Sequence, residues 1–280
     1  MKKLLFSLSL LASVAAVADD DLTGGIDVSA QTTAVMTLVN TTDTSFILAV
    51  PWVTATNAAA TTISVADIVD PSTLSTGDIL RWYDTSAGGF KVWQLVETAG
   101  VKVWNPVSTV TASKTLDGSN AGETFVKRGD AVILYRANPA ANGGIIRLSG
   151  QYIALSSSDT TTVTSSSSAA VYALIAPPVT ADYDINSLIW TVNGCAVTSD
   201  EAKAVIPRGA STGLKVIANK RDGKAATYYL DSSDKTTKAF NFGLRKGSWT
   251  SVPAQAAGQG FWFVVPASAD TLTFTLTWGN

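Results

Sequence analysis

Large apolar side chains and hydroxyl side chains alternate along the end of this chain. Leu272, Phe274, Leu276 and Trp278 are separated by single threonines. Because successive side chains of a β-strand point to opposite faces, this period of two places the four apolar groups on one face and the hydroxyls on the other. The pattern predicts a strand of an antiparallel sheet that packs one face on a core and exposes the other to water.

Further segments rich in apolar, aromatic and β-branched residues predict additional strands. They are DILRWYD (78–84), FKVWQLV (90–96), AVILYRA (131–137), LKVIANK (214–220), ATYYLD (226–231) and GFWFVVPA (260–267). Gly, Asn, Asp and Ser residues separate these segments, which is typical of tight turns. The predicted fold class is all-β, with antiparallel strands that form β-sandwiches or small barrels.

One turn signature occurs twice in the chain. Residues 71–77 and residues 207–213 both consist of Pro, three residues and Ser-Thr-Gly. Upstream of each turn, FILAVPWVT (46–54) is similar to YALIAPPVT (172–180). Recurring turns and strands at a similar spacing predict that the chain contains two diverged tandem copies of one β-rich module.

Each copy has a short segment before the turn that predicts a helix. Residues 64–69 precede Pro71, and residues 200–206 lie between Ser199 and Pro207. A serine at the N-cap and acidic residues in the first turn favour helix initiation, and a following proline disfavours continuation. We therefore expect one short helix in each module.

The N-terminus has the pattern of a secretory signal peptide. Lys2 and Lys3 precede an apolar run from Leu4 to Ala16, and a small-x-small site ends at Ala18 before three aspartates. This apolar run is too short to span a bilayer as a mature anchor, and no later segment approaches the necessary length of about 20 residues. We expect cleavage after Ala18 and a secreted or cell-surface bacterial protein without a transmembrane segment.

Composition divides the rest of the chain. Residues 156–170 are mostly Ser and Thr, with one charged residue, Asp159, and one large apolar residue, Val163. Such a tract buries too little to offset its ordering entropy, which predicts a flexible linker; an outer strand is the alternative, because threonine favours sheets. The predicted segments are the signal peptide (1–18), an N-terminal arm (19–43), module 1 (44–155), the linker (156–170) and module 2 (171–280).

The composition also excludes several classes of function. The chain has no His and a single cysteine, Cys195, so an intrachain disulfide is impossible and the commonest general base and metal ligand are missing. Without Lys2 and Lys3, 18 basic residues remain against 22 acidic ones, a net charge of −4. The basic residues are scattered, which argues against binding to nucleic acid. We predict no enzymatic activity, no catalytic residue, no metal site and no cofactor.

Tryptophan is the one residue type that indicates a ligand. Trp82, Trp93 and Trp104 all lie in the first module. Exposed aromatic rings on a sheet can stack on sugar rings, so these residues are candidates for binding a polysaccharide. The alternative is that a fold without disulfides uses tryptophan as bulky core, and the sequence leaves both interpretations open.

The pattern LAVPW…TGD…YD…GF…W…RG resembles that of uncharacterised exported bacterial proteins with one or two copies of a β-rich module. The resemblance covers most of the mature chain. The second module departs from it, with Pro178 at the position of Trp52 and Leu214 at the position of Asp78. The resemblance implies a modular exported protein and carries no activity with it.

These observations favour an exported structural protein, a β-rich subunit of a filament, sheath or layer that self-associates by strand pairing. The arm (residues 22–40) and the last strand (271–278) are the expected donors, and the arm pairs either in its own module or on a neighbouring subunit. The main alternative is a carbohydrate-binding or adhesive module that uses Trp82, Trp93 or Trp104. A hydrolase, the third interpretation, needs a pair of carboxylates in a cleft.

Overall fold

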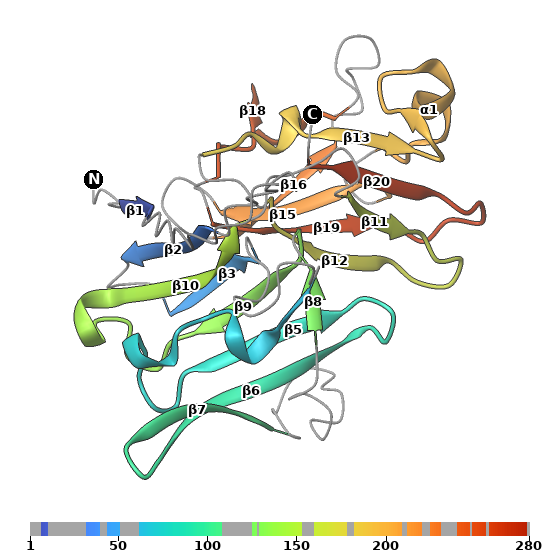
Figure 1. Cartoon of the computed structure of the whole chain (residues 1–280). Coiled ribbons are helices and arrows are strands. Elements are labelled where there is room, and N and C mark those ends of the chain that lie inside the picture. The colour runs from blue at the N-terminus through green and yellow to red at the C-terminus, as the bar shows by residue number, and fades with distance from the viewer. Residues whose placement is uncertain are drawn as a thin grey trace, which may run out of the picture.

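A computed structural model of the chain describes residues 7–10, 32–39, 44–50, 62–107, 125–127, 129–152, 160–177, 182–208, 212–219, 225–230, 240–246, 248–255 and 258–278. These residues form mostly antiparallel β-structure (Figure 1). The prediction of an all-β fold class is confirmed.

In chain order, the first ten strands are β1 (Ser7–Leu10), β2 (Thr32–Val39), β3 (Ser45–Ala49), β4 (Thr62–Ser64), β5 (Ile79–Asp84), β6 (Gly89–Thr98), β7 (Val101–Pro106), β8 (Phe125–Lys127), β9 (Ala131–Tyr135) and β10 (Ile145–Tyr152). The remaining strands are β11 (Thr160–Thr164), β12 (Val171–Ile175), β13 (Ile189–Val192), β14 (Cys195–Ala196), β15 (Lys215–Asn219), β16 (Ala225–Leu230), β17 (Phe242–Lys246), β18 (Ser248–Ser251), β19 (Phe261–Val265) and β20 (Thr273–Thr277). The helical elements are the 3-10 turns η1 (Val65–Asp67), η2 (Pro71–Thr73), η4 (Ala141–Gly144) and η5 (Ile185–Ser187) and the α-helix α1 (Asp200–Val205).

The first half of the molecule, residues 32–152, is built around a five-stranded sheet with the order β3-β9-β5-β6-β7. β2 and β10 pair in a second sheet, and β4 pairs with β8. Alternate side chains of the five-stranded sheet point inward, as the period of two requires. The resulting core consists of Leu48, Val50, Val65, Ile68, Val69, Leu74, Leu80, Trp93, Leu95, Trp104, Val126, Val132, Leu134, Ile146 and Leu148.

The second half, residues 160–278, contains a six-stranded sheet with the order β12-β19-β15-β16-β17-β18 and a four-stranded sheet with the order β11-β20-β13-β14. Phe274 and Leu276 of β20 are fully buried in its core, as the alternation of the last strand predicts. The aromatic rings of Trp190 and Phe263 stack there with centroids 4.5 Å apart. Such a core stabilises the half without a disulfide.

The central sheets of the two halves have the same strand order. β12, β19, β15, β16 and β17 follow one another as β3, β9, β5, β6 and β7 do, and β11 pairs with β20 as β2 pairs with β10. The registers also match from the turns at Gly77 and Gly213 onward. Equivalent positions are Leu80 and Val216, Trp93 and Tyr228, and Leu134 and Phe263. The match supports the interpretation of two diverged copies, which stays a prediction.

The structural equivalence of β3 and β12 is shifted by one residue from the alignment of their sequences. The sequence alignment places Phe46 on Tyr172, whereas the pairing with β9 and β19 makes Ser45 equivalent to Tyr172. In this register Leu48 and Ile175 both face a core. A shift of one residue would move the apolar side chains of one strand from the core face to the opposite face, so burial decides the register.

The prediction of a flexible linker at residues 156–170 is wrong for its central part. Thr160–Thr164 is the strand β11, which pairs with β20 over five residues. Its alternation buries Thr161 and Val163, while Thr162 and Thr164 face threonines of β20 on the outer side. The alternative interpretation, an outer strand, is therefore the correct one for this stretch.

The two segments expected to donate a strand to a neighbouring subunit, the arm and the last strand, are both paired inside the molecule. β2, the end of the N-terminal arm, pairs with β10 over eight residues. β20 lies between β11 and β13 and is hydrogen-bonded on both sides. The arm therefore pairs within its own half through β2, and both edges of β20 are occupied within this copy, so a transfer of β20 to a neighbour stays a prediction.

The helix predictions differ between the halves. In the second half Ser199 caps α1, with its Oγ accepting from the N–H of Ala202 at 3.2 Å. In the first half the predicted helix is replaced by the 3-10 turns η1 and η2. The reason is that Val69 forms a β-bridge with Leu148, and the N–H of Asp70 donates to Arg147 O at 2.9 Å. Pairing with β10 removes the backbone groups that a helix would need.

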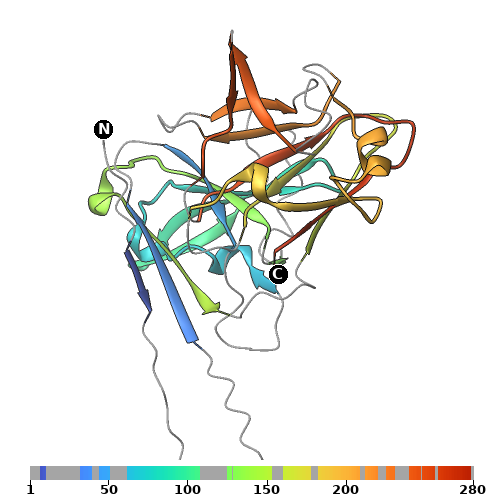
Figure 2. The same ribbon diagram turned by 90° about the horizontal axis from the view of Figure 1, so that it is seen from above.

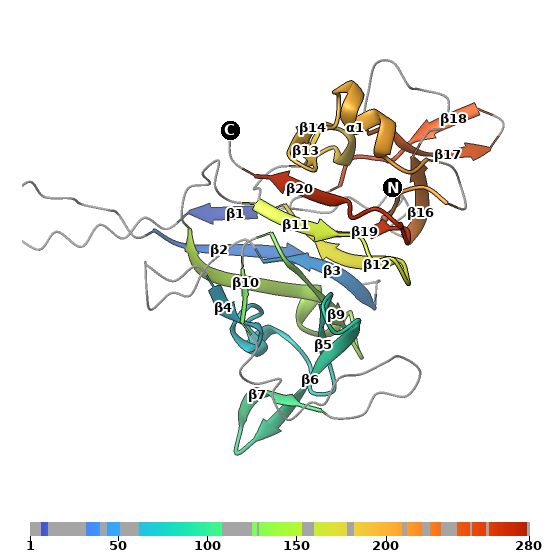
Figure 3. The same ribbon diagram turned by 90° about the vertical axis from the view of Figure 1, so that its right-hand side faces the viewer.

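Residues of the predicted signal peptide also take part in a sheet. β1 (Ser7–Leu10) pairs antiparallel with β2, which lies between β1 and β10 (Figure 3). This contact bears on the state of the chain before any cleavage. Cleavage after Ala18 stays a prediction.

The two halves meet through their backbones, with β3 and β12 at the centre of the molecule (Figure 1). Each half lends hydrogen-bond partners to the edge strand of the other. The bonds are Ala49 N–H to Gly258 O (2.8 Å), Gly260 N–H to Ile47 O (3.1 Å) and Ala176 N–H to Gly129 O (3.0 Å). The reciprocal pairing satisfies polar groups on the outer edges of both strands.

Candidate functional site: a groove beside the edge strand β7

The three candidate tryptophans do not form an exposed platform. Trp93 is completely buried, and Trp104 is 8% exposed, with its Nε1 donating to Val69 O at 3.3 Å. Trp82 is partly exposed, and the ammonium of Lys91 lies 5.6 Å from its ring centroid. Two of the three rings are therefore core, which leaves Trp82 as the candidate with exposed ring area, and binding of a polysaccharide stays a prediction.

A different aromatic cluster lies where the halves meet. Trp262 of the second half contacts Tyr83 and Phe90 of the first half and Tyr172 of its own half, all edge to face, with centroid distances of 5.0, 6.0 and 6.3 Å. Burial raises the pKa of Tyr83, with further contributions from Tyr172 and Asp84. The sequence does not reveal this cluster, because its members come from four strands of both halves. It fixes the two sheets against each other.

Strand β7 is the edge of the five-stranded sheet in the part of the chain that the structure describes. Val101 and Val103 are 61% and 43% exposed on it, which is unusual in a chain that buries most of its large aliphatic side chains. The N–H of Val107 donates to Val92 O, so every second residue of β7 bonds to β6. Lys102 and Trp104 are out of phase with Val107, and their backbone groups therefore point away from the sheet.

A groove of about 410 Å³ lies beside these outward groups. Lys102, Val103 and Trp104 line one side, and the segment from Ala66 to Pro71 lines the other. Asp67 and Asp70 belong to the second wall, while the Lys102 ammonium is already bonded to Leu74 O at 2.6 Å. The groove therefore combines acidic side chains with outward backbone groups of an edge strand.

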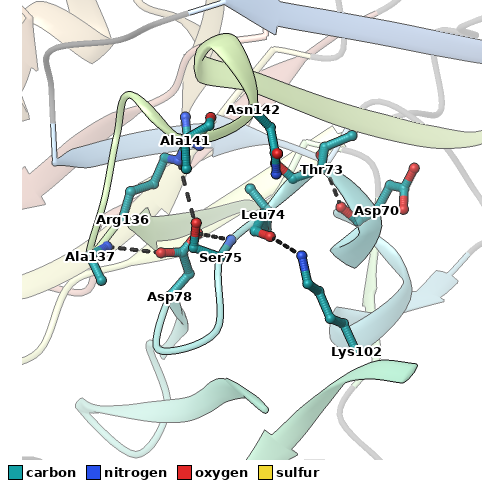
Figure 4. A network of polar contacts seen from close by, with 10 residues as sticks. All are labelled: Asp70, Thr73, Leu74, Ser75, Asp78, Lys102, Arg136, Ala137, Ala141 and Asn142. Atoms are coloured by element: carbon teal, nitrogen blue, oxygen red, sulfur yellow. Dashed lines mark hydrogen bonds and ion pairs between the residues drawn. The ribbon is translucent and has the colours of Figure 1, made fainter. Parts of the chain in front are cut away.

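Hydrogen bonds hold the second wall in place (Figure 4). Asp70 Oδ1 accepts from Ser72 N–H at 2.9 Å, and Thr73 Oγ1 donates to Asp70 O at 3.2 Å. Asn142 Nδ2 reaches across from η4 and donates to Thr73 O at 3.1 Å. Together with the bond from Lys102, these contacts fix η2 against both β7 and η4, so the groove is a preformed feature.

A buried ion pair anchors the end of the same turn (Figure 4). Asp78 and Arg136 are both completely buried, with Arg136 Nε 3.9 Å from Asp78 Oδ2. The carboxylate also accepts from Ser75 N–H (3.0 Å) and Ala137 N–H (2.8 Å), and Arg136 Nη2 donates to Ala141 O (3.2 Å). Burial lowers the pKa of the guanidinium, and Asp78 offsets part of this shift. These groups are structural, because no solvent reaches them.

In the second half, the position beside the equivalent strand is occupied. β17 corresponds to β7, and β18 pairs with it antiparallel over four residues. Phe242 occupies the place of Trp104, and its outward C=O accepts from Val252 N–H at 2.9 Å. Asn186 Oδ1 accepts from its N–H at 2.7 Å. The same outward backbone groups that face the groove in the first half therefore have strand and side-chain partners in the second.

Other polar residues have structural contacts. Asp184 Oδ1 accepts from Asn186 N–H at 2.9 Å and its Oδ2 from Ser187 Oγ at 3.3 Å, so this acidic loop is an Asx turn at the start of η5. Among the described residues, acidic and cysteine side chains nowhere gather in a set of three that could hold a metal ion. Cys195 is a free thiol. None of the helices in the described ranges is long and apolar enough to cross a membrane.

Comparison with known proteins adds no identity to this picture. No family model, curated protein or solved structure matches the chain. The resemblance to exported modular proteins therefore stays a prediction, and the groove with the edge strand beside it is the feature that indicates a function.

Proposed function

We propose that this chain is an exported structural subunit that self-associates, accepting an extended segment of a second copy along the side of β7 that faces the groove. The observation that supports the proposal is the difference between the equivalent strands β7 and β17. In the second half β18 fills the position beside β17, and among the described residues of the first half the equivalent position is a groove. The molecule thus contains an example of the strand pairing that the proposal places between copies.

The physical basis of the proposal is the cost of unpaired backbone groups at an edge. A strand added to an edge gains one hydrogen bond for each outward N–H and C=O, and recognition by strand addition uses this source of affinity. Val101 and Val103 add apolar area next to the bonds. Pro106 is in phase with Lys102 and Trp104, so its missing N–H removes no bond to β6. An added strand would find no N–H donor at this residue, and the part of β7 that can pair with it ends here.

The preformed wall lowers the cost of ordering when a strand is added in the groove. η2 is fixed on one side by Lys102 and on the other by Asn142, so the groove needs little ordering on binding. The few charges of the chain and its many Thr, Ser, Ala and Val residues favour a second copy as the source of the strand.

The test is sedimentation velocity of residues 19–280 at increasing concentration. We expect concentration-dependent oligomers, and we expect the double variant Val101→Lys/Val103→Lys to shift them toward monomer, because two charges are placed on the added strand's path. The matched control is Val205→Lys. Val205 is 43% exposed, as Val103 is, but lies on α1 rather than on a strand of the five-stranded sheet. A wild-type chain that stays monomeric at every concentration, or oligomers that persist unchanged in the double variant, would overturn the proposal.

A further inference from the structure

The strand β2 has an edge whose occupancy depends on the predicted signal peptide. β10 covers one side of β2 over all eight residues, from Thr32 to Val39. β1 covers the other side over four residues, with Leu8 opposite Met36 and Leu10 opposite Ala34 (Figure 3). β1 lies entirely within residues 1–18, so cleavage after Ala18 would remove the strand that covers this edge.

We propose that the mature chain pairs β2 with β2 of a second copy, in the place that β1 occupies before cleavage. The inference rests on the proposed self-association and adds a second contact to it, distinct from the one at β7. The signal peptide then has two roles: it directs export, and it blocks this edge until the protein has been exported. Assembly inside the cell is thereby prevented by a segment of the chain itself.

The geometry of the existing pair defines the expected contact. β1 shows that an antiparallel strand fits on this side of β2. Two copies of one strand pair antiparallel when a twofold axis passes between them, which is the self-complementary arrangement of a symmetric dimer. The product is one continuous sheet with the order β10-β2-β2-β10, in which neither β2 strand keeps an open edge.

The two contacts differ in their consequences. A contact of β2 with itself closes after two copies, since a twofold interface uses the same surface on both partners. A contact at β7 joins two different surfaces, because a groove receives a segment from elsewhere on the next copy. The β2 contact alone stops at a dimer, and the β7 contact alone gives rings or open chains. Dimers formed through β2 carry two β7 grooves, so the combination links such chains into larger assemblies.

A cysteine scan tests the contact directly. Single cysteines are introduced from Thr33 to Leu38 in exported residues 19–280 that carry Cys195→Ser and Val101→Lys/Val103→Lys, so that the native thiol and the β7 contact are absent. Near a twofold axis a residue faces its own copy, and this proximity falls off in both directions along the strand. We expect disulfide-linked dimers at one or two neighbouring positions and little cross-linking elsewhere.

A competing peptide supplies the second measurement. A synthetic peptide of residues 1–13, which contains β1, should bind the mature protein and convert β2-linked dimers to monomers, and a scrambled peptide should not. Mass spectrometry of the exported protein must show a chain that begins at Asp19. A retained leader, a scan without a maximum, or dimers that ignore the peptide would each overturn this inference. If wild-type oligomers still form and respond to the β7 variant, the proposed function stands without it.

Discussion

The turn that ends at Gly77 and the turn that ends at Gly213 occupy the same place in their sheets but are held by different interactions. After Gly77 comes Asp78, buried with Arg136, and after Gly213 comes Leu214, which is also fully buried. The residue equivalent to Arg136 is Val265, since the residue before each, Tyr135 and Val264, pairs with equivalent positions of β5 and β15. A buried ion pair in one half thus corresponds to an apolar pair in the other.

The backbone around the pair changes consistently with this exchange. In the first half the N–H of Ala137 needs an acceptor inside the protein and finds Asp78 Oδ1 at 2.8 Å. In the second half the equivalent residue is Pro266, which has no N–H. The apolar solution therefore needs no buried acceptor at this point. The fold requires a filled position here and accepts either chemistry.

The halves also differ at the far end of the same sheets. Figure 2 shows β17 and β18 (orange-red) as a hairpin that projects from the body of the molecule. Among the described strands of the first half, β7 ends its sheet, and the groove lies beside it. The polar anchor at Asp78 and this groove occur in the same half. Asp78 and Asn142 both fix the turn that forms the wall of the groove, so the half with the candidate site is also the half with the more polar interior.

The largest effect is expected from breaking the ion pair on one side. Asp78→Ala leaves the Arg136 guanidinium buried without its carboxylate, and removal of one partner of a buried pair costs about 3–5 kcal/mol. The free energy of unfolding should fall by this amount in urea titrations of residues 19–280.

The rescue variant copies the second half. Asp78→Leu/Arg136→Val/Ala137→Pro removes both charges and one of the two backbone donors that bond to Asp78. The other donor, Ser75 N–H, loses its acceptor, so we expect the variant to recover part of the stability lost in Asp78→Ala. A triple variant as unstable as the single one would show that the halves are not interchangeable at this position.

The junction, where β3 and β12 of the two halves meet, offers a second test with a somewhat smaller effect. A Cβ at Gly260 would lie 2.7 Å from Ile175 O and 2.7 Å from Ile47 Cγ2, both from strands whose positions are fixed by pairing. Overpacking of this kind costs about 1–3 kcal/mol. Gly260→Ala should therefore lower the free energy of unfolding by about that amount in the same titrations.

Gly129 tests the junction from the side of the first half. Its φ is +91°, and a Cβ there would collide with the ring of Trp278 and lie 2.7 Å from Thr161 Oγ1, both in the second half. Gly129→Ala should therefore cost about 1–3 kcal/mol for the close contact, in addition to the strain of a positive φ. The same urea titrations measure this loss.

Gly194 is the matched control for Gly129. Its φ is +81°, and nothing lies within 4 Å of the position of a Cβ. Gly194→Ala should show only the backbone strain of about 1–2 kcal/mol, so the difference between the two variants isolates the contact at the junction. Equal losses in both would show that the two halves are not packed as closely as the hydrogen bonds between them require.

The third prediction concerns Tyr183, a phenol at a position where the first half has no tyrosine. Tyr183 pairs with Gln255 where the first half pairs Ile63 with Val126, and its hydroxyl donates to Gln259 O at 2.9 Å. Burial raises the pKa of Tyr183 well above its usual value of 10.0. The unfolded chain therefore releases this proton near pH 10 and the folded chain does not, so the stabilisation is complete below pH 10 and is lost as the pH rises above it.

The slope above pH 10 should be about 1.4 kcal/mol per pH unit for this one group. Urea titrations from about pH 9 to about pH 11 measure it in the wild type and in Tyr183→Phe. The variant should lose about 0.5–1.5 kcal/mol below pH 10 for the missing hydrogen bond and should show a shallower slope above it. An unchanged slope would assign the alkaline loss to other groups.

Much of the fold could be predicted from the sequence because strands and turns have local patterns. The alternation around Phe274 and the two Pro-x-x-x-Ser-Thr-Gly turns predict elements that the structure contains. β11 could not be predicted in the same way, because the burial of Val163 depends on pairing with β20, more than a hundred residues away. The same holds for η1 and η2, where pairing with β10 overrides the local preference for a helix.

The candidate site was less accessible to prediction. Trp93 and Trp104 have the sequence pattern of any aromatic residue in a strand, and only the pairing of β5, β6 and β7 shows that they face the core. The partner of Asp78 is Arg136, which no local pattern connects with it. The groove depends on all of these long-range contacts at once. The sequence signal for the groove is the alternation of Val101 and Val103 with Lys102 and Trp104, which is the pattern of a strand.

The smallest effect is expected at the two serines that precede the predicted helices. Ser199 Oγ accepts from Ala202 N–H at 3.2 Å, so Ser199→Ala should cost about 1 kcal/mol, the usual value for an N-cap. Ser64 precedes η1 without a side-chain hydrogen bond to the turn, and Ser64→Ala should stay within about 0.5 kcal/mol of the wild type. Urea titrations of both variants make the comparison. A loss at Ser64 as large as that at Ser199 would mean that the first half also has a capped helix in solution, and that pairing with β10 does not displace it.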